Sequence, residues 1–189
     1  MGQRHQIYIR YKHNSKLETI GFHHQWIWGY AACRQLARVI QFYEAAVAYA
    51  NRDYMPMAQA FEAVYSVDIE SGYYSKIHRL ESCDYPENED NNNGITVIDL
   101  TGERPRYAFA SFVGLECLDA SKENSYKNWT PISAHEYLTL HYPNYETPER
   151  PFDHQCQTIA GYLRNFETIN IGQLNKIFPE SSLNKKRVK

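Results

Sequence analysis

Alternating apolar and polar residues near the start of the chain predict a β-hairpin. Residues 6–12 and 20–28 both alternate with period two, and the turn residues Asn14 and Ser15 lie between them. A turn centred on these two residues pairs His5 with His24. The pairing places one set of apolar side chains together on a core face: Ile7, Ile9, Ile20, Phe22 and Trp26. The other face of the hairpin is then expected to be polar and open to solvent.

Helical periodicity follows the hairpin. Between Tyr30 and Asn51, apolar residues recur at spacings of three and four and form one stripe, as in an amphipathic helix. Ser133 and Glu136 make a capping box at the start of a short helix that Pro143 ends. Further elements are predicted from similar patterns: a helix from Pro56 to about Ser66, irregular or extended chain over 72–85, a polar loop over 84–94, strands over 95–100 and 106–114, and helices over 152–166 and 171–178.

Two hairpins separated by helices predict an α+β fold, with a mainly antiparallel sheet covered by amphipathic helices. We expect a single domain over residues 1–179 and a flexible basic tail over residues 180–189. The chain contains no apolar run of the roughly 20 residues that a membrane span needs. The four cysteines are widely spaced and predict reduced, partly buried thiols. We therefore expect a cytoplasmic protein with no membrane partner.

The charge of the chain is unevenly distributed. The 189 residues have a formal net charge of −2, which excludes a general nucleic-acid coat. Residues 1–43 nevertheless contain six basic residues against Glu18 alone, whereas residues 44–179 contain ten basic and twenty acidic residues. This asymmetry favours an anionic partner for the N-terminal part, or a homo-oligomer in which unlike faces associate.

Several catalytic and metal-binding signatures are missing. The sequence has no phosphate-binding glycine loop, no nucleophile elbow and no zinc-binding histidine pair at helical spacing. The acidic segment over 84–94 starts like a calcium loop, but Val97 and Leu100 stand where ligands would be required. We therefore predict no catalytic residue, no metal and no cofactor, and a binding protein rather than an enzyme.

Charged, amide and aromatic groups gather on the predicted hairpin and on the helix after it. Arginine suits phosphate, glutamine and histidine suit base edges, and tyrosine suits stacking on a base. We predict a binding site for a small, anionic, nucleotide-like ligand, formed by Arg4, His5, Gln6, Tyr8, Arg10, His23, His24, Gln25, Arg34 and Arg38. Aromatic residues in predicted loops, Tyr142 and Tyr145 among them, line a pocket, anchor a protein interface or pack beneath the loops.

Three segments resemble small uncharacterised proteins of bacteriophages and mobile elements: residues 1–7, 22–26 and 92–99. The resemblance brings no active site with it. It implies a phage context, in which small proteins counter host defence by sequestering a nucleotide signal or by blocking a host defence protein, and it places the chain in the host cytoplasm.

Two alternatives remain open at this stage. His5 and His24 could act as the acid and base of a metal-independent phosphodiesterase or ribonuclease, provided that both are open to solvent. Alternatively, the carboxylates of the acidic loop over 84–94 could imitate a nucleic acid and inhibit a basic host defence protein.

Overall fold

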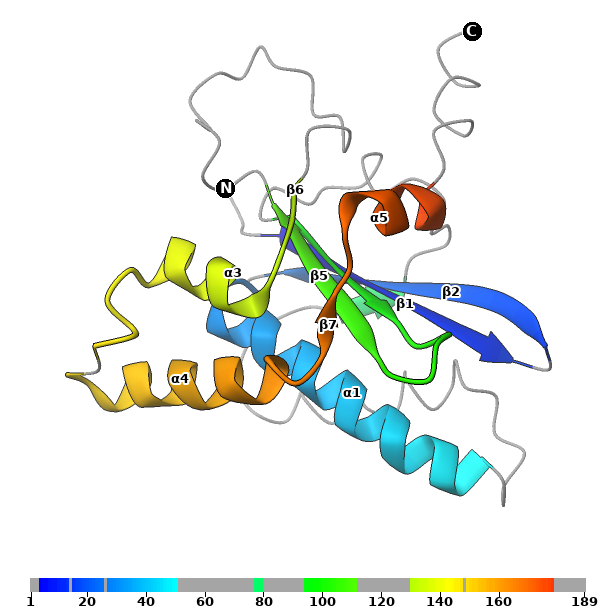
Figure 1. Ribbon diagram of the computed structural model, residues 1–189, viewed down its shortest axis with the longest axis horizontal. Helices are drawn as coiled ribbons and strands as arrows, with labels where there is room; N and C mark the ends of the chain where they lie inside the picture. The colour runs from blue at the N-terminus through cyan, green and yellow to red at the C-terminus, as the bar shows by residue number, and fades with distance from the viewer. Residues whose placement is uncertain are drawn as a thin grey trace, which may run out of the picture.

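The strands that the structure describes form one seven-stranded sheet, with helices against both of its faces (Figure 1). The computed structural model describes residues 4–13, 15–25, 27–50, 77–79, 94–111, 130–147 and 149–178. Its strands are β1 (Arg4–His13), β2 (Lys16–Gln25), β3 (Ile77–Arg79), β4 (Ile95–Asp99), β5 (Arg106–Ser111), β6 (Thr130–Ile132) and β7 (Glu167–Thr168). Its helices are α1 (Tyr30–Ala50), α3 (Ala134–His141), α4 (Pro151–Leu163) and α5 (Ile171–Ile177). The α+β class is therefore as predicted.

The first hairpin has the register that the sequence predicts. His5 pairs with His24, Ile7 with Phe22 and Ile9 with Ile20 across β1 and β2. Ser15 has a φ of 64°, the left-handed conformation that a two-residue hairpin turn requires. The turn residues and the alternation therefore specify the same pairing.

The sheet is mixed rather than mainly antiparallel. Its strand order is β3-β2-β1-β4-β5-β6, and β7 also pairs with β5. Within each hairpin the strands are antiparallel, but β4 runs parallel to β1 and β7 runs parallel to β5. Local patterns predict pairing within a hairpin. The pairing of β1 with β4 joins segments far apart in the sequence, so the local patterns do not indicate its direction.

The helices begin and end close to their predicted positions. In the capping box of α3, the Glu136 amide donates to Ser133 Oγ over 3.2 Å and the Ser133 amide donates to Glu136 Oε2 over 2.7 Å. Gly29, just before α1, has a φ of 54°, and a Cβ on it would lie 2.5 Å from the Tyr142 hydroxyl oxygen. Both the positive φ and the close approach of Tyr142 require glycine here.

Each face of the sheet is covered by its own hydrophobic core. On one face, Ile7 and Ile9 of β1 pack with residues of α1, α3 and α4. On the other face, where α5 lies (Figure 1), Tyr8 packs with residues of β4 and β5, with Leu174 of α5 and with Phe178 just after α5. The side of β1 expected to be open to solvent is therefore buried at Tyr8.

Cys33 in α1 and Cys156 in α4 are buried free thiols, as predicted for these two residues. Burial raises the pKa of Cys33, and it raises the pKa of Cys156 to about 11. The predicted helix over 56–66, the acidic loop up to residue 93 and the tail over 180–189 lie outside the described residues. Among the helices that the structure describes, none is both long and apolar enough to cross a membrane.

Candidate functional site

The ten predicted site residues do not form one site. His5 shares the face of Ile7 and Ile9, which α1 covers, whereas Tyr8 packs toward α5. Because side chains alternate along a strand, Gln6 and Arg10 lie on the α5 side with Tyr8, and His23 joins them opposite Gln6. Arg34 and Arg38 stand on α1, beyond the other face. The sheet therefore separates Arg10 and His23 from the two helical arginines.

Gln6 and Tyr8 are structural in this fold. Both are fully buried, and the Tyr8 hydroxyl donates a hydrogen bond to Gln6 Oε1 over 2.8 Å. The Tyr8 ring meets Phe178 edge-on at a centroid distance of 5.3 Å. The prediction that Gln6 and Tyr8 face solvent is wrong, because both are buried and Leu174 and Phe178 pack over Tyr8. His23 is also buried, at 6% exposure, and Arg10 is half-buried.

His5 and His24 are adjacent but buried. They are partners across β1 and β2, and neither exposes any surface. His5 Nε2 lies 2.7 Å from Thr96 Oγ1, and the His5 ring lies 6.4 Å from the Tyr137 ring of α3. A catalytic pair would have to meet water and a phosphodiester. The phosphodiesterase or ribonuclease alternative requires both histidines to be open to solvent, and in the structure neither is. Arg4 and Gln25 are partners at the open end of the same hairpin.

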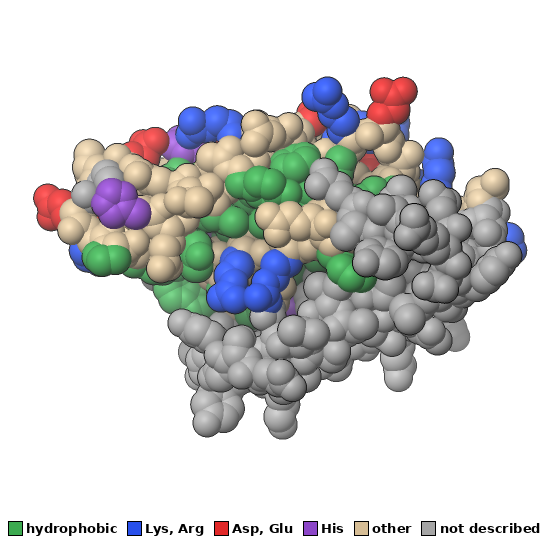
Figure 2. All heavy atoms as spheres, turned by 90° about the horizontal axis from the view of Figure 1, so that it is seen from below, with side chains coloured by type: hydrophobic (Ala, Val, Ile, Leu, Met, Phe, Trp, Pro, Cys, Tyr) green, Lys and Arg blue, Asp and Glu red, His purple; other side chains and the backbone are tan. Residues whose placement is uncertain are grey.

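Tyr30, Arg34 and Arg38 form a strip along α1, each four residues from the next and each half-buried. Burial lowers the pKa of Arg38 and the nearby charge of Arg34 lowers it further, while Tyr30 acts in the opposite direction. Tyr30 meets Phe152 of α4 edge-on at 5.5 Å. Figure 2 shows the side of the molecule where α1 and α4 lie, with cationic side chains grouped near its centre. We call Tyr30, Arg34 and Arg38 the α1 strip.

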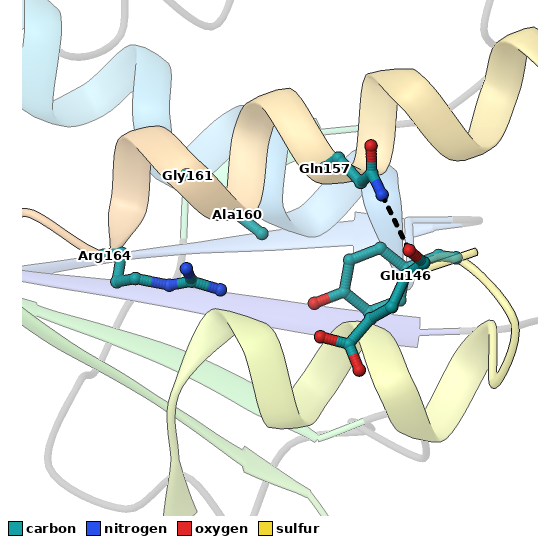
Figure 3. A pocket seen from close by; sticks show the side chains of 6 residues that line it. Glu146, Gln157, Ala160, Gly161 and Arg164 are labelled. Carbon is teal, nitrogen blue, oxygen red and sulfur yellow. Dashed lines mark hydrogen bonds between the residues drawn. The ribbon is translucent and has the colours of Figure 1, made fainter. Parts of the chain in front are cut away.

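A separate hollow lies where the α3–α4 connection meets α4 (Figure 3). Its volume is about 230 Å³, and it is lined by Tyr145, Glu146, Gln157, Ala160, Gly161 and Arg164. Of these residues, only Tyr145 was a pocket candidate from the sequence. Glu146 and Arg164 belong to different segments, and neither is part of a sequence motif. No local pattern therefore predicted that they line the same hollow.

Tyr145 links the hollow to α3. Its hydroxyl is hydrogen-bonded to His135 Nδ1, and the same nitrogen lies 3.6 Å from Glu146 Oε1. Burial, followed by the charge of Glu146, raises the pKa of Tyr145, which opposes its use as a nucleophile. Within the described ranges, no group of three His, Cys, Asp or Glu side chains is arranged to hold a metal ion. The groups present are suited to hydrogen bonding and charge pairing.

Comparison of the chain with protein-family models, with curated proteins and with solved structures finds no match.

Proposed function

We propose that this protein binds a small, anionic, nucleotide-like ligand on the α1 strip. The observation that carries the proposal is that two half-buried arginines, Arg34 and Arg38, stand four residues apart on α1 and therefore share one face of the helix. They are the only charged residues between positions 30 and 43 of the sequence. Among the residues that the structure describes, Arg34 makes no ion pair.

A bound phosphate would relieve an unfavourable arrangement. Like charges four residues apart destabilise a helix by about 0.2–0.5 kcal/mol, and partial burial of each charge adds to this cost. A phosphate between the two guanidinium groups replaces this repulsion with charge-assisted hydrogen bonds, each of about 1.5–3 kcal/mol. The arginine pair therefore favours an anion with several oxygens over a single halide ion.

Tyr30 adds a group suited to a base. Tyr30 is partly buried, and the edge-on contact with the Phe152 ring fixes its ring at the end of the strip. Stacking of a base on an aromatic ring contributes about 1–3 kcal/mol and does not depend on which base is present. Tyr30 therefore replaces Tyr8 as the residue expected to stack on a base, because Tyr8 is buried.

The residues of the α1 strip are suited to binding a ligand and not to catalysing its reaction. The strip itself contains no histidine that could transfer a proton to a bound phosphate ester, and His5 and His24 of the sheet are fully buried. In the phage context that the sequence resembles, such a protein would sequester a nucleotide signal from the host. The ligand is expected to leave the protein unchanged.

Calorimetric titration with AMP, GMP, ATP, cyclic AMP, cyclic GMP and cyclic di-GMP tests the proposal. Adenosine and guanosine serve as controls without phosphate. We expect saturable heat with at least one phosphate-bearing compound, weakening as salt is added, and none with the nucleosides. The nucleotide recovered by chromatography should be intact. No heat with any nucleotide, at protein concentrations able to reveal micromolar binding, would overturn the proposal.

A further inference from the structure

The hollow beside α4 combines two opposite charges on a small apolar floor. Figure 3 shows Arg164 extending along the hollow from the end of α4 toward the α3–α4 connection, where Glu146 lies. Gln157 Nε2 donates to the Glu146 carbonyl oxygen over 3.0 Å and fixes the connection against α4. The polar side chains are thus held on two elements that pack together.

The two charges are available to a ligand. The Glu146 side chain is 59% exposed and lies 3.6 Å from His135 Nδ1. Arg164 is exposed and has no carboxylate partner among the residues that the structure describes. One side of the hollow therefore presents a guanidinium group and the other presents a carboxylate.

Small residues leave the floor of the hollow open. Ala160 and Gly161 follow each other on α4, and both line it. A Cβ built on Gly161 would meet no atom within 4 Å. Glycine inside a helix costs about 1 kcal/mol relative to alanine. The absence of a side chain at position 161 therefore leaves space at the expense of helix stability.

We propose that this hollow binds a small zwitterion, a free α-amino acid, with its carboxylate on Arg164 and its ammonium group on Glu146. The planar guanidinium group can hold a carboxylate through two parallel hydrogen bonds. The volume of about 230 Å³ lies below the roughly 300–1,000 Å³ typical of pockets for larger ligands. The hollow therefore suits an amino acid with a short side chain and not a nucleotide, and it is independent of the α1 strip.

Amide-detected NMR titration of the full chain with L-alanine and L-serine tests this site. Propionate and ethylamine are the controls, because each keeps only one of the two charges of alanine. We expect saturable shifts of backbone amides between residues 145 and 164 with the amino acids at millimolar concentrations, and at least tenfold weaker binding of the controls. The absence of saturable shifts with both amino acids, or equal binding of propionate, would overturn the proposal.

Three variants separate binding from folding. Arg164→Gln and Glu146→Gln should each weaken the amino acid at least tenfold. Gly161→Leu should abolish binding by filling the hollow, whereas Gly161→Ala should preserve it while raising the melting temperature. Arg34→Gln should leave amino-acid binding unchanged, so failure at this site is distinguishable from failure of the α1 strip. Unchanged binding in Gly161→Leu would place the ligand elsewhere and contradict the assignment.

Discussion

His5 and His24 face each other across β1 and β2, and both imidazoles are completely buried. His5 Nε2 lies 2.7 Å from the hydroxyl oxygen of Thr96 on the neighbouring strand β4. This hydrogen bond connects β1 of the first hairpin to β4 of the second hairpin. These two strands are neighbours in the sheet and run parallel. The histidine pair therefore belongs to the core of the sheet, and its contribution is to stability.

Thr96→Val should destabilise the protein by about 1–3 kcal/mol, because it leaves a buried imidazole nitrogen without its partner. Urea unfolding monitored by circular dichroism measures the change. Thr96→Ser keeps the hydroxyl and is the matched control, with a smaller loss expected from the missing methyl group. Equal stability of the valine variant and the wild type would show that the His5 contact contributes nothing.

Phe178→Ala should expose Tyr8 and loosen α5 from the sheet. Phe178 is 2% exposed and packs edge-on against Tyr8, and replacing a buried phenylalanine by alanine typically costs about 3–5 kcal/mol. Urea unfolding gives the loss, and amide hydrogen exchange over 171–177 shows whether α5 detaches. Lys176→Ala, an exposed position on the same helix, should change stability by no more than about 0.5 kcal/mol. A small effect of Phe178→Ala would mean that α5 does not hold this face closed.

His141 should make stability depend on pH. Its ring is half-buried between Trp28 and Tyr137, at centroid distances of 5.4 and 4.6 Å, and burial lowers its pKa from the ordinary 6.5. The unfolded chain then binds a proton more readily than the folded chain. The stabilisation that neutral His141 contributes is fully present above pH 6.5. It declines as the pH falls below that value toward the lower pKa of the folded state.

His141→Phe keeps an aromatic ring and removes the titration. Between about pH 7.5 and about pH 5, the wild type should lose more unfolding free energy than this variant. Urea unfolding at both pH values measures the difference. Parallel losses in the two proteins would show that the protonation of His141 is not coupled to folding.

The sequence predicts the local elements well because their signals are local. The alternation around Asn14 and Ser15 specifies the β1–β2 register, and the Ser133 capping box specifies the start of α3. These local signals do not show that the second face of β1, the face of Tyr8, is covered as well. That depends on α5, whose Leu174 comes more than 160 residues after Tyr8 in the chain. The expectation of solvent exposure at Tyr8 failed for this reason.

The candidate site residues also divide into those that a local sequence pattern predicts and those that only the packing of distant segments brings together. Arg34 and Arg38 could be placed on one helix face from their spacing alone, and both lie in α1 as this requires. The hollow beside α4 could not be predicted, because Glu146 and Arg164 are brought to it by the packing of the α3–α4 connection against α4. Only Tyr145 gave a signal there, as an aromatic residue in a predicted loop.

The most direct test of the α1 strip compares two doubly substituted proteins that lose the same charge. Arg34→Gln/Arg38→Gln removes both guanidinium groups, whereas Lys12→Gln/Lys16→Gln removes two exposed lysines of the first hairpin. Calorimetric titration with the best-bound nucleotide should show at least a hundredfold weaker affinity for the arginine variant, since two charge-assisted hydrogen bonds of about 1.5 kcal/mol correspond to roughly that factor. The lysine variant should bind as the wild type does. Equal affinity of the arginine variant and the wild type, or equal weakening of both variants, would contradict a ligand site on α1.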